Sequence, residues 1–154
     1  MYHSFMAFQS IGEMMESFAA EAISVAAREY KIELDYGADS LQQIESILAM
    51  VYERSQHGMF ADLAAKPSGD QDLERNCKLW GGYLGEVVRR RWGGEWTLAP
   101  YPGWHSLVPS IEVNGSRLFP LMKIHRRLTQ GSAESVWNFY QMLSGKLGPQ
   151  TTLQ

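Results

Sequence analysis

Residues 79–96 combine large apolar side chains with glycines, and this combination limits how the chain can fold. Their sequence is LWGGYLGEVVRRRWGGEW. From residue 73 onward, one set of residues recurs at spacings of three and four, which predicts a long helix with one buried face. These residues are Leu73, Cys77, Trp80, Leu84, Val87, Val88 and Arg91. Gly93 and Gly94 then favour the helix end, because glycine accepts the left-handed backbone conformation without a Cβ clash.

Gly81, Gly82 and Gly85 lie inside this helical pattern and require a compensating contact. Each costs about 1 kcal/mol relative to alanine in a helix interior. Gly81 and Gly85 are four residues apart, so they form a flat strip that another helix or strand can approach closely. Alternatively, the strip receives a small ligand, with Glu86 beside it as an acid or base. We favour close packing, since this is the commoner reason for glycine within a helix.

Two shorter helices are predicted before the long one. The first covers residues 10–30, where apolar residues again recur at spacings of three and four. The second ends near residue 54 and is capped by Asp39 or Ser40, with Ser40 and Gln43 forming a capping box.

After the long helix the period of the apolar pattern changes from 3.6 to 2, which predicts a small antiparallel sheet. Residues 95–98 form its first strand. Asn114-Gly115 supplies the two positive φ angles of a type I′ hairpin between strands 107–113 and 116–119. This turn pairs Ile111 with Leu118, Val113 with Ser116, and Glu112 with Arg117, the last as a cross-strand ion pair.

Two helices are predicted after the sheet. Pro120 opens a short helix over residues 121–128, and Ser132 caps a last helix that ends at Gly148. Residues 150–154 are predicted to be a frayed tail. The predicted fold class is therefore α+β, in one domain spanning residues 1–154. It comprises three N-terminal helices, a small antiparallel sheet of about three strands with an Asn-Gly hairpin, and two C-terminal helices.

Composition excludes several classes of protein and site. The single cysteine, Cys77, excludes an internal disulfide and a cysteine-based zinc cluster, and its place on the apolar face predicts an inert core thiol. The four histidines show no ligand spacing, so neither a metal nor a cofactor is expected. No apolar run approaches the ~18 residues of a membrane span, and residues 1–9 lack the pattern of a signal peptide. We therefore expect a cytoplasmic protein without membrane contact.

Charge is distributed unevenly along the chain. Residues 1–76 hold 13 acidic and 5 basic residues, a net charge of −8, whereas residues 77–154 hold 4 and 9, a net charge of +5. Either the two halves are solvated faces that attract each other within the fold, or the acidic half steers a basic partner. The bases occur in two short groups, 89–91 and 123–127, without interleaved exposed aromatic residues, so a nucleic-acid partner is not expected.

Two motifs resemble a group of small uncharacterised bacterial domains with the pattern DYS…GAYLGEV…GG.W. The matching residues are Leu34-Asp35-Tyr36 with Ser40-Leu41, and GYLGEVV at 82–88 with Gly93-Gly94-Glu95-Trp96. The chain departs from the pattern at Gly37, where serine is common, and at Gly82, where alanine is usual. The resemblance, which covers residues 32–145, implies a bacterial cytoplasmic α+β domain and no established catalytic residue. By analogy, small acidic proteins of this type recur as immunity partners of secreted toxins.

The leading functional hypothesis is a non-enzymatic protein-binding domain, specifically an immunity protein that neutralises a secreted toxin by direct binding. Acidic contacts are expected from Asp35, Asp39 and Glu45. Aromatic loop contacts are expected from Tyr101, Trp104 and His105, since interface centres favour tryptophan and tyrosine.

Two alternatives remain. One is a small-ligand or regulatory domain with its pocket at Gly81, Gly85 and Glu86. The other is an enzyme that uses Glu86 or His105. The sequence contains no phosphate-binding loop, no His-Glu-x-x-His motif and no nucleophile elbow, so an enzyme is the less favoured hypothesis.

Overall fold

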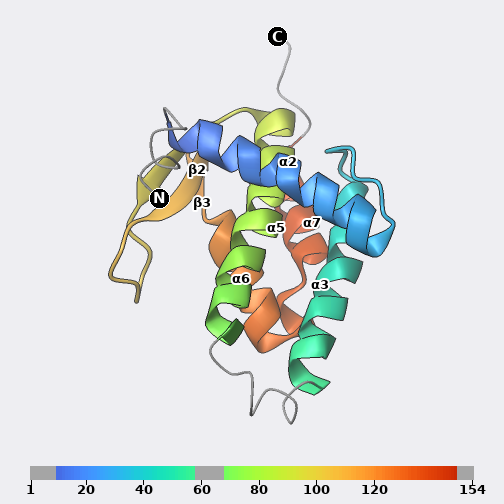
Figure 1. The fold of residues 1–154 in the computed structure, drawn as a ribbon. Helices are drawn as coiled ribbons and strands as arrows, with labels where there is room; N and C mark the ends of the chain where they lie inside the picture. Colours follow the sequence, from blue (N-terminus) through green and yellow to red (C-terminus); the bar gives the residue numbers. More distant parts are fainter. Residues whose placement is uncertain (1–9, 58–67, 149–154) are drawn as a thin grey trace.

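The computed structural model describes residues 10–57 and 68–148 (Figure 1). Its helices are α2 (Ile11–Tyr30), α3 (Ser40–His57), α5 (Ser68–Trp92), α6 (Pro120–Gln130) and α7 (Val136–Leu147), with a 3-10 turn, η1 (Ser132–Glu134), before α7. Between α5 and α6 lie the strands β1 (Glu95–Ala99), β2 (Val108–Val113) and β3 (Ser116–Leu118), which form one antiparallel sheet. The predicted α+β order of three helices, sheet and two helices is confirmed. The tail predicted at 150–154 lies outside the described residues.

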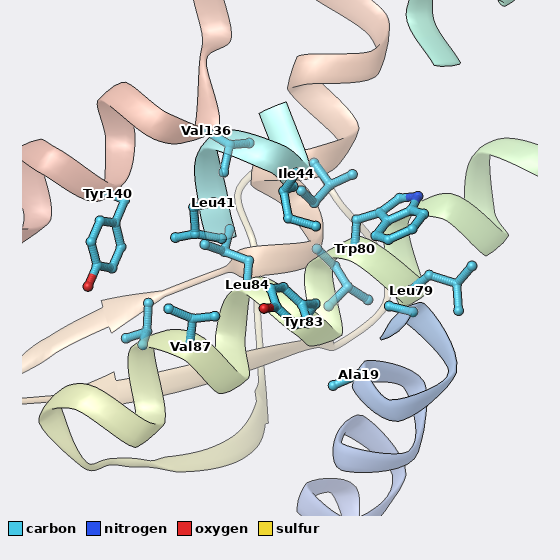
Figure 2. Close-up of a cluster of buried hydrophobic side chains, with 14 of the residues drawn as sticks. Ala19, Leu41, Ile44, Leu79, Trp80, Tyr83, Leu84, Val87, Val136 and Tyr140 are labelled. Carbon is cyan, nitrogen blue, oxygen red and sulfur yellow. The ribbon is translucent and has the colours of Figure 1, made fainter. Parts of the chain in front are cut away.

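α5 is the central element of the fold (Figure 1). α2 crosses it, α6 packs against it from another side, and α3 packs chiefly against α6 and α7. Figure 2 shows Leu41 of α3 between Val136 of α7 on one side and Leu84 and Tyr83 of α5 on the other. The buried side chains form one continuous core that joins the helices to the sheet. The apolar face predicted for α5 is therefore the centre of that core.

Close packing at the helical glycines is confirmed. A Cβ atom on Gly81 would lie 2.7 Å from the Cα atom of Leu121 in α6, and one on Gly85 would lie 2.2 Å from the ring of Trp96 in β1. Real side chains do not approach so closely, so only glycine allows these two elements to reach α5. The space that the ligand hypothesis assigned to a pocket beside Gly81 and Gly85 is filled by Leu121 and Trp96.

The hairpin has the predicted register. Ile111 pairs with Leu118, Glu112 with Arg117, and Val113 with Ser116. Asn114 and Gly115 have φ angles of 49° and 83°, as a type I′ turn requires. On the exposed face Arg117 Nη2 donates to Glu112 Oε1 over 3.1 Å, so the predicted cross-strand ion pair is also present.

Two serines predicted as helix caps, Ser40 and Ser132, do not cap a helix, whereas Asp39, the predicted alternative to Ser40, directly precedes α3. Ser40 is buried, and its hydroxyl donates to the Gly37 carbonyl and shares a 2.6 Å hydrogen bond with the Tyr83 hydroxyl, so it does not form a capping box. Ser132 begins the 3-10 turn, and Ser135 caps α7 by accepting a 3.1 Å hydrogen bond from the Asn138 amide.

Replacing Gly85 by alanine should lower the free energy of unfolding by about 2 kcal/mol or more, because the added methyl group overlaps the Trp96 ring. Urea denaturation measures the change. The matched control is Gly145→Ala in α7, where an added Cβ meets nothing within 4 Å. That substitution should stabilise the protein by about 0.5–1 kcal/mol through helix propensity. Equal stability of Gly85→Ala and the wild type would contradict the close contact.

Candidate functional site

A mostly apolar groove of about 550 Å³ lies between the first half of α5, the segment that enters β2, and α6. This volume is in the range of ligand-binding clefts. We call it the Trp104 groove and define it by the residues that line it: Leu73, Glu74, Cys77, Lys78, Trp104, Leu107, Val108, Pro109, Leu121, Met122 and His125.

A tight turn positions Trp104 at the edge of this groove. The Trp104 amide donates to the Tyr101 carbonyl over 3.0 Å, and Gly103 has a φ angle of 81°. Pro102 followed by a glycine at positive φ is the signature of a type II β-turn. The aromatic loop thus contains a proline-glycine turn that directs a tryptophan toward α6.

Aromatic contacts hold the turn in place. The Tyr101 ring packs on Phe119 with centroids 4.9 Å apart, and its hydroxyl accepts a hydrogen bond from Arg126. The Trp104 ring makes edge contacts with Tyr101 at 6.4 Å and with His125 at 5.4 Å. Tyr101 therefore anchors the turn, and Trp104 is held between two rings.

Trp104 and Leu107 remain largely open to solvent. Trp104 is 46% exposed and Leu107 is 58% exposed, and both line the same groove. Single exposed apolar residues are ordinary on protein surfaces, whereas neighbouring ones beside an apolar groove are typical of an interaction site. The groove with its two exposed apolar side chains is the strongest candidate contact surface among the described residues.

Cys77 belongs to the groove but is not reactive. Burial, and to a lesser extent the charge of Glu74, raises the pKa of its thiol to about 12. At neutral pH the sulfur is a protonated thiol, which is a poor nucleophile and a poor metal ligand. The predicted inert core thiol is confirmed.

The three acidic residues predicted as contacts have different environments. Asp35 is exposed and accepts a 2.9 Å hydrogen bond from the Gly37 amide, and Asp39 is exposed just before α3. Glu45 instead points into the fold, where it accepts hydrogen bonds from Arg127 Nε at 2.6 Å and from the Val136 amide at 2.7 Å. Its carboxylate caps α7 and pairs with α6, so it is committed to internal contacts.

The structure does not place the predicted acidic contact residues beside the predicted aromatic ones. The segment with Asp35 meets the C-terminal half of α5, since Tyr36 bonds to the Tyr83 hydroxyl and stacks under Arg90. Trp104 instead shares its groove with the N-terminal half of α5. The acidic residues and the loop therefore belong to different parts of the surface.

Glu86 is a fully buried carboxylate that joins several segments. Arg89 binds it through two nitrogens at 2.9 Å, Arg90 Nε donates to it over 3.3 Å, and Trp96 Nε1 of β1 donates over 2.8 Å. Arg89 also reaches Glu16 of α2 at 3.0 Å. We call Glu86, Arg89, Arg90 and Trp96 the Glu86 network.

The resemblance motifs meet at this network. The Arg90 guanidinium lies 3.6 Å from the centre of the Tyr36 ring, and Tyr36 stacks on Tyr83 with centroids 5.1 Å apart. Tyr36 has a φ angle of 68°, and its amide donates to the Tyr83 hydroxyl over 2.7 Å. The Asp-Tyr and Gly-Tyr-Leu-Gly-Glu motifs therefore pack directly against each other.

Glu86 is poorly suited to acid–base chemistry. Burial acts to raise its pKa, but hydrogen bonds from Arg89, Trp96 and Arg90 outweigh burial and hold the pKa below its ordinary value. A general acid or base works best with a pKa near the working pH, and Glu86 stays ionised there. His105 is exposed in the Trp104 loop, and within residues 10–57 and 68–148 no hydrogen bond or ion pair joins it to Glu86.

Sequence reasoning found the loop but missed the α6 side of the groove. Met122 and His125 line it, together with Leu121, which also packs in the core. The spacing of Leu121 and His125, four residues apart on one helical face, was the available signal. What the sequence did not reveal is that this face of α6 extends from the core to the groove.

No protein-family model, curated protein or solved structure matches the chain. Family membership therefore stays a prediction from the motifs. Within the described parts of the chain, no helix is long and apolar enough to cross a bilayer, and no group of three or more His, Cys, Asp or Glu side chains has the arrangement of a metal site.

Replacing Glu86 by glutamine should lower the free energy of unfolding at pH 7 by about 2 kcal/mol, because the guanidinium groups lose their carboxylate. Since the folded-state pKa lies below the unfolded value, the contribution of Glu86 is complete above about pH 4.3 and is lost as pH falls through the folded-state pKa. The difference between Glu86→Gln and the wild type should therefore shrink in acid. Urea denaturation at several pH values measures it.

Glu112→Gln is the control for this prediction. Its ion pair with Arg117 is solvent-exposed, so the loss should be about 0.5 kcal/mol or less. Equal losses in the two variants would show that the Glu86 network does not stabilise the fold in the way its geometry implies.

Proposed function

We propose that the chain is a non-enzymatic protein-binding domain whose partner docks on the Trp104 groove. The observation that carries this proposal is an exposed tryptophan held between Tyr101 and His125 at the edge of an apolar groove. Tryptophan is enriched among the few residues that dominate binding energy, and such residues lie in well-packed apolar surroundings. Leu107 extends the same apolar surface.

The rigidity of the turn supports the same function. A loop that must become ordered on binding loses affinity through conformational entropy. Here the Pro102-Gly103 turn, the Tyr101–Phe119 contact and the bond from Arg126 order the loop in the free protein. A partner would meet a surface that is already formed.

For the biological role, we propose an immunity protein that neutralises a secreted bacterial toxin in the cytoplasm, with neither nucleic acid nor membrane as partner. The motif resemblance supports this role by analogy. The net charge of −8 on residues 1–76 adds support, because an acidic surface attracts a basic protein before contact. Since exposed Asp35 and Asp39 lie away from the groove, we assign them to steering and the groove to contact.

The test uses a candidate toxin, the product of a gene adjacent to the one for this chain, and isothermal titration with the purified proteins. The wild type should form a stoichiometric complex that abolishes the toxin's activity. Trp104→Ala and Leu107→Ala should each weaken binding by about tenfold or more, because each removes an apolar anchor. Their melting temperatures should stay close to that of the wild type, since both side chains are largely exposed.

Met142→Ala is the matched control, because Met142 is a 68% exposed apolar residue on α7 outside the groove. It should bind as the wild type does. Raising the salt concentration should slow association by the wild type more than it speeds dissociation. Full affinity in both groove variants would refute docking at this surface, and toxin activity unaffected by the wild type would refute the immunity role for that pair.

A further inference from the structure

A second cleft opens between α3 and α5, near the C-terminal end of α2. Its volume is about 550 Å³, and α6 contributes Leu128 to its lining. That volume accommodates a small organic ligand. Of its lining residues, only Leu73 also borders the Trp104 groove, so the two sites lie on different sides of α5.

Aromatic rings from three helices line this cleft: Tyr30 of α2, Tyr52 of α3 and Trp80 of α5. Tyr30 meets Trp80 edge-on, with centroids 6.4 Å apart. Trp80 is fixed by a 2.9 Å hydrogen bond from its Nε1 to Asn76 Oδ1, and the Tyr30 hydroxyl accepts a 3.0 Å hydrogen bond from Arg54. Trp80 is only 1% exposed, so the partly exposed rings of Tyr30 and Tyr52 provide the apolar surface for another flat ring, and Trp80 supports Tyr30 from within the core.

Two charges in the cleft have no opposite partner within residues 10–57 and 68–148. Arg54 lies on the α3 side and Asp72 on the α5 side, and neither forms an ion pair there. The other charged lining residues do have partners, as in the pair between Arg75 and Glu21 at 3.3 Å. The cleft thus offers one available cation and one available anion on facing helices.

The α3 side of the cleft carries additional unused hydrogen-bonding capacity. Within the described residues the Tyr52 hydroxyl makes no hydrogen bond. The guanidinium of Arg127 lies 5.9 Å from the centre of the Tyr52 ring, and its buried Nη1 has no partner. Arg127 is already paired with Glu45 and does not line the cleft, so Arg54 is the cation that would attract a negative ligand group on this side.

We propose that this cleft binds a free aromatic amino acid. The ring packs on Tyr30 and Tyr52, the carboxylate pairs with Arg54, and the ammonium group pairs with Asp72. A planar guanidinium binds a carboxylate through two parallel hydrogen bonds, which suits Arg54 to this role. The site is independent of the protein-binding function assigned to the Trp104 groove.

Isothermal titration of the full chain tests the ligand class. L-Tryptophan should bind about tenfold or more tightly than L-leucine, which lacks the aromatic ring. Its affinity should exceed, by a similar factor, that of tryptamine, which lacks the carboxylate, and that of indole-3-propionate, which lacks the ammonium group.

Charge-specific variants test the assignment of each group. Arg54→Gln should weaken binding of L-tryptophan about tenfold and that of tryptamine much less, the smaller loss reflecting the lost bond to the Tyr30 hydroxyl. Asp72→Asn should weaken L-tryptophan and leave indole-3-propionate unaffected. Arg117→Gln is the control, since Arg117 is an exposed arginine of β3 that does not line the cleft and pairs with none of its residues. It should bind as the wild type does, and so should Trp104→Ala.

Three results would overturn the proposal. The first is no binding of L-tryptophan, L-tyrosine or L-phenylalanine at about 5 mM, a concentration that would reveal even millimolar affinity. The second is equal affinity of L-tryptophan for the wild type, Arg54→Gln and Asp72→Asn. The third is loss of binding in Trp104→Ala, which would place the ligand in the groove.

Discussion

Trp96 of β1 contacts the central helix α5 at two adjacent residues, and the positions of the neighbouring elements depend on that contact. Its ring lies where a side chain on Gly85 would be, and its Nε1 donates to the buried carboxylate of Glu86. Desolvating a carboxylate costs several kcal/mol unless hydrogen bonds compensate, so Glu86 requires Trp96 and the arginines to be in place. Through Arg89 and Arg90 the same carboxylate is connected to α2 and to Tyr36. One ionised group therefore sets the relative positions of the sheet, two helices and the turn before α3.

This arrangement separates the C-terminal half of α5, which holds the fold together, from the N-terminal half, which lines the two proposed binding sites. The C-terminal half of the helix is held by the Glu86 network. The N-terminal half lines the Trp104 groove on one side and the aromatic cleft on the other, with Leu73 bordering both. Fixing one end of a long helix in a packed network gives the other end a defined position, which a preorganised binding surface requires.

The Asp-Tyr and Gly-Tyr-Leu-Gly-Glu motifs have a physical explanation in this fold. Tyr36, Tyr83, Glu86 and Trp96 stack or hydrogen-bond within one connected set of contacts, and Gly85 makes room for the tryptophan. In this chain the pattern joins the central helix to the sheet. It does not identify a partner, because the proposed contact residues Trp104 and Leu107 lie outside it.

The sequence by itself determined the elements whose causes are local. Periodicity predicted the helices, and Asn114-Gly115 predicted the hairpin and its register, since each depends on neighbours within a few residues. Gly81 and Gly85 predicted a close approach, but only the fold shows that Leu121 and Trp96 make it. Tertiary structure alone decided that Ser40 bonds to Tyr83 and that Glu45 caps α7, because residues distant in sequence supply those partners. It also decided which charges stay unpaired and where grooves open. Whether a polar side chain forms a hydrogen bond or ion pair depends on which residues the fold places beside it. The local sequence pattern does not contain that information.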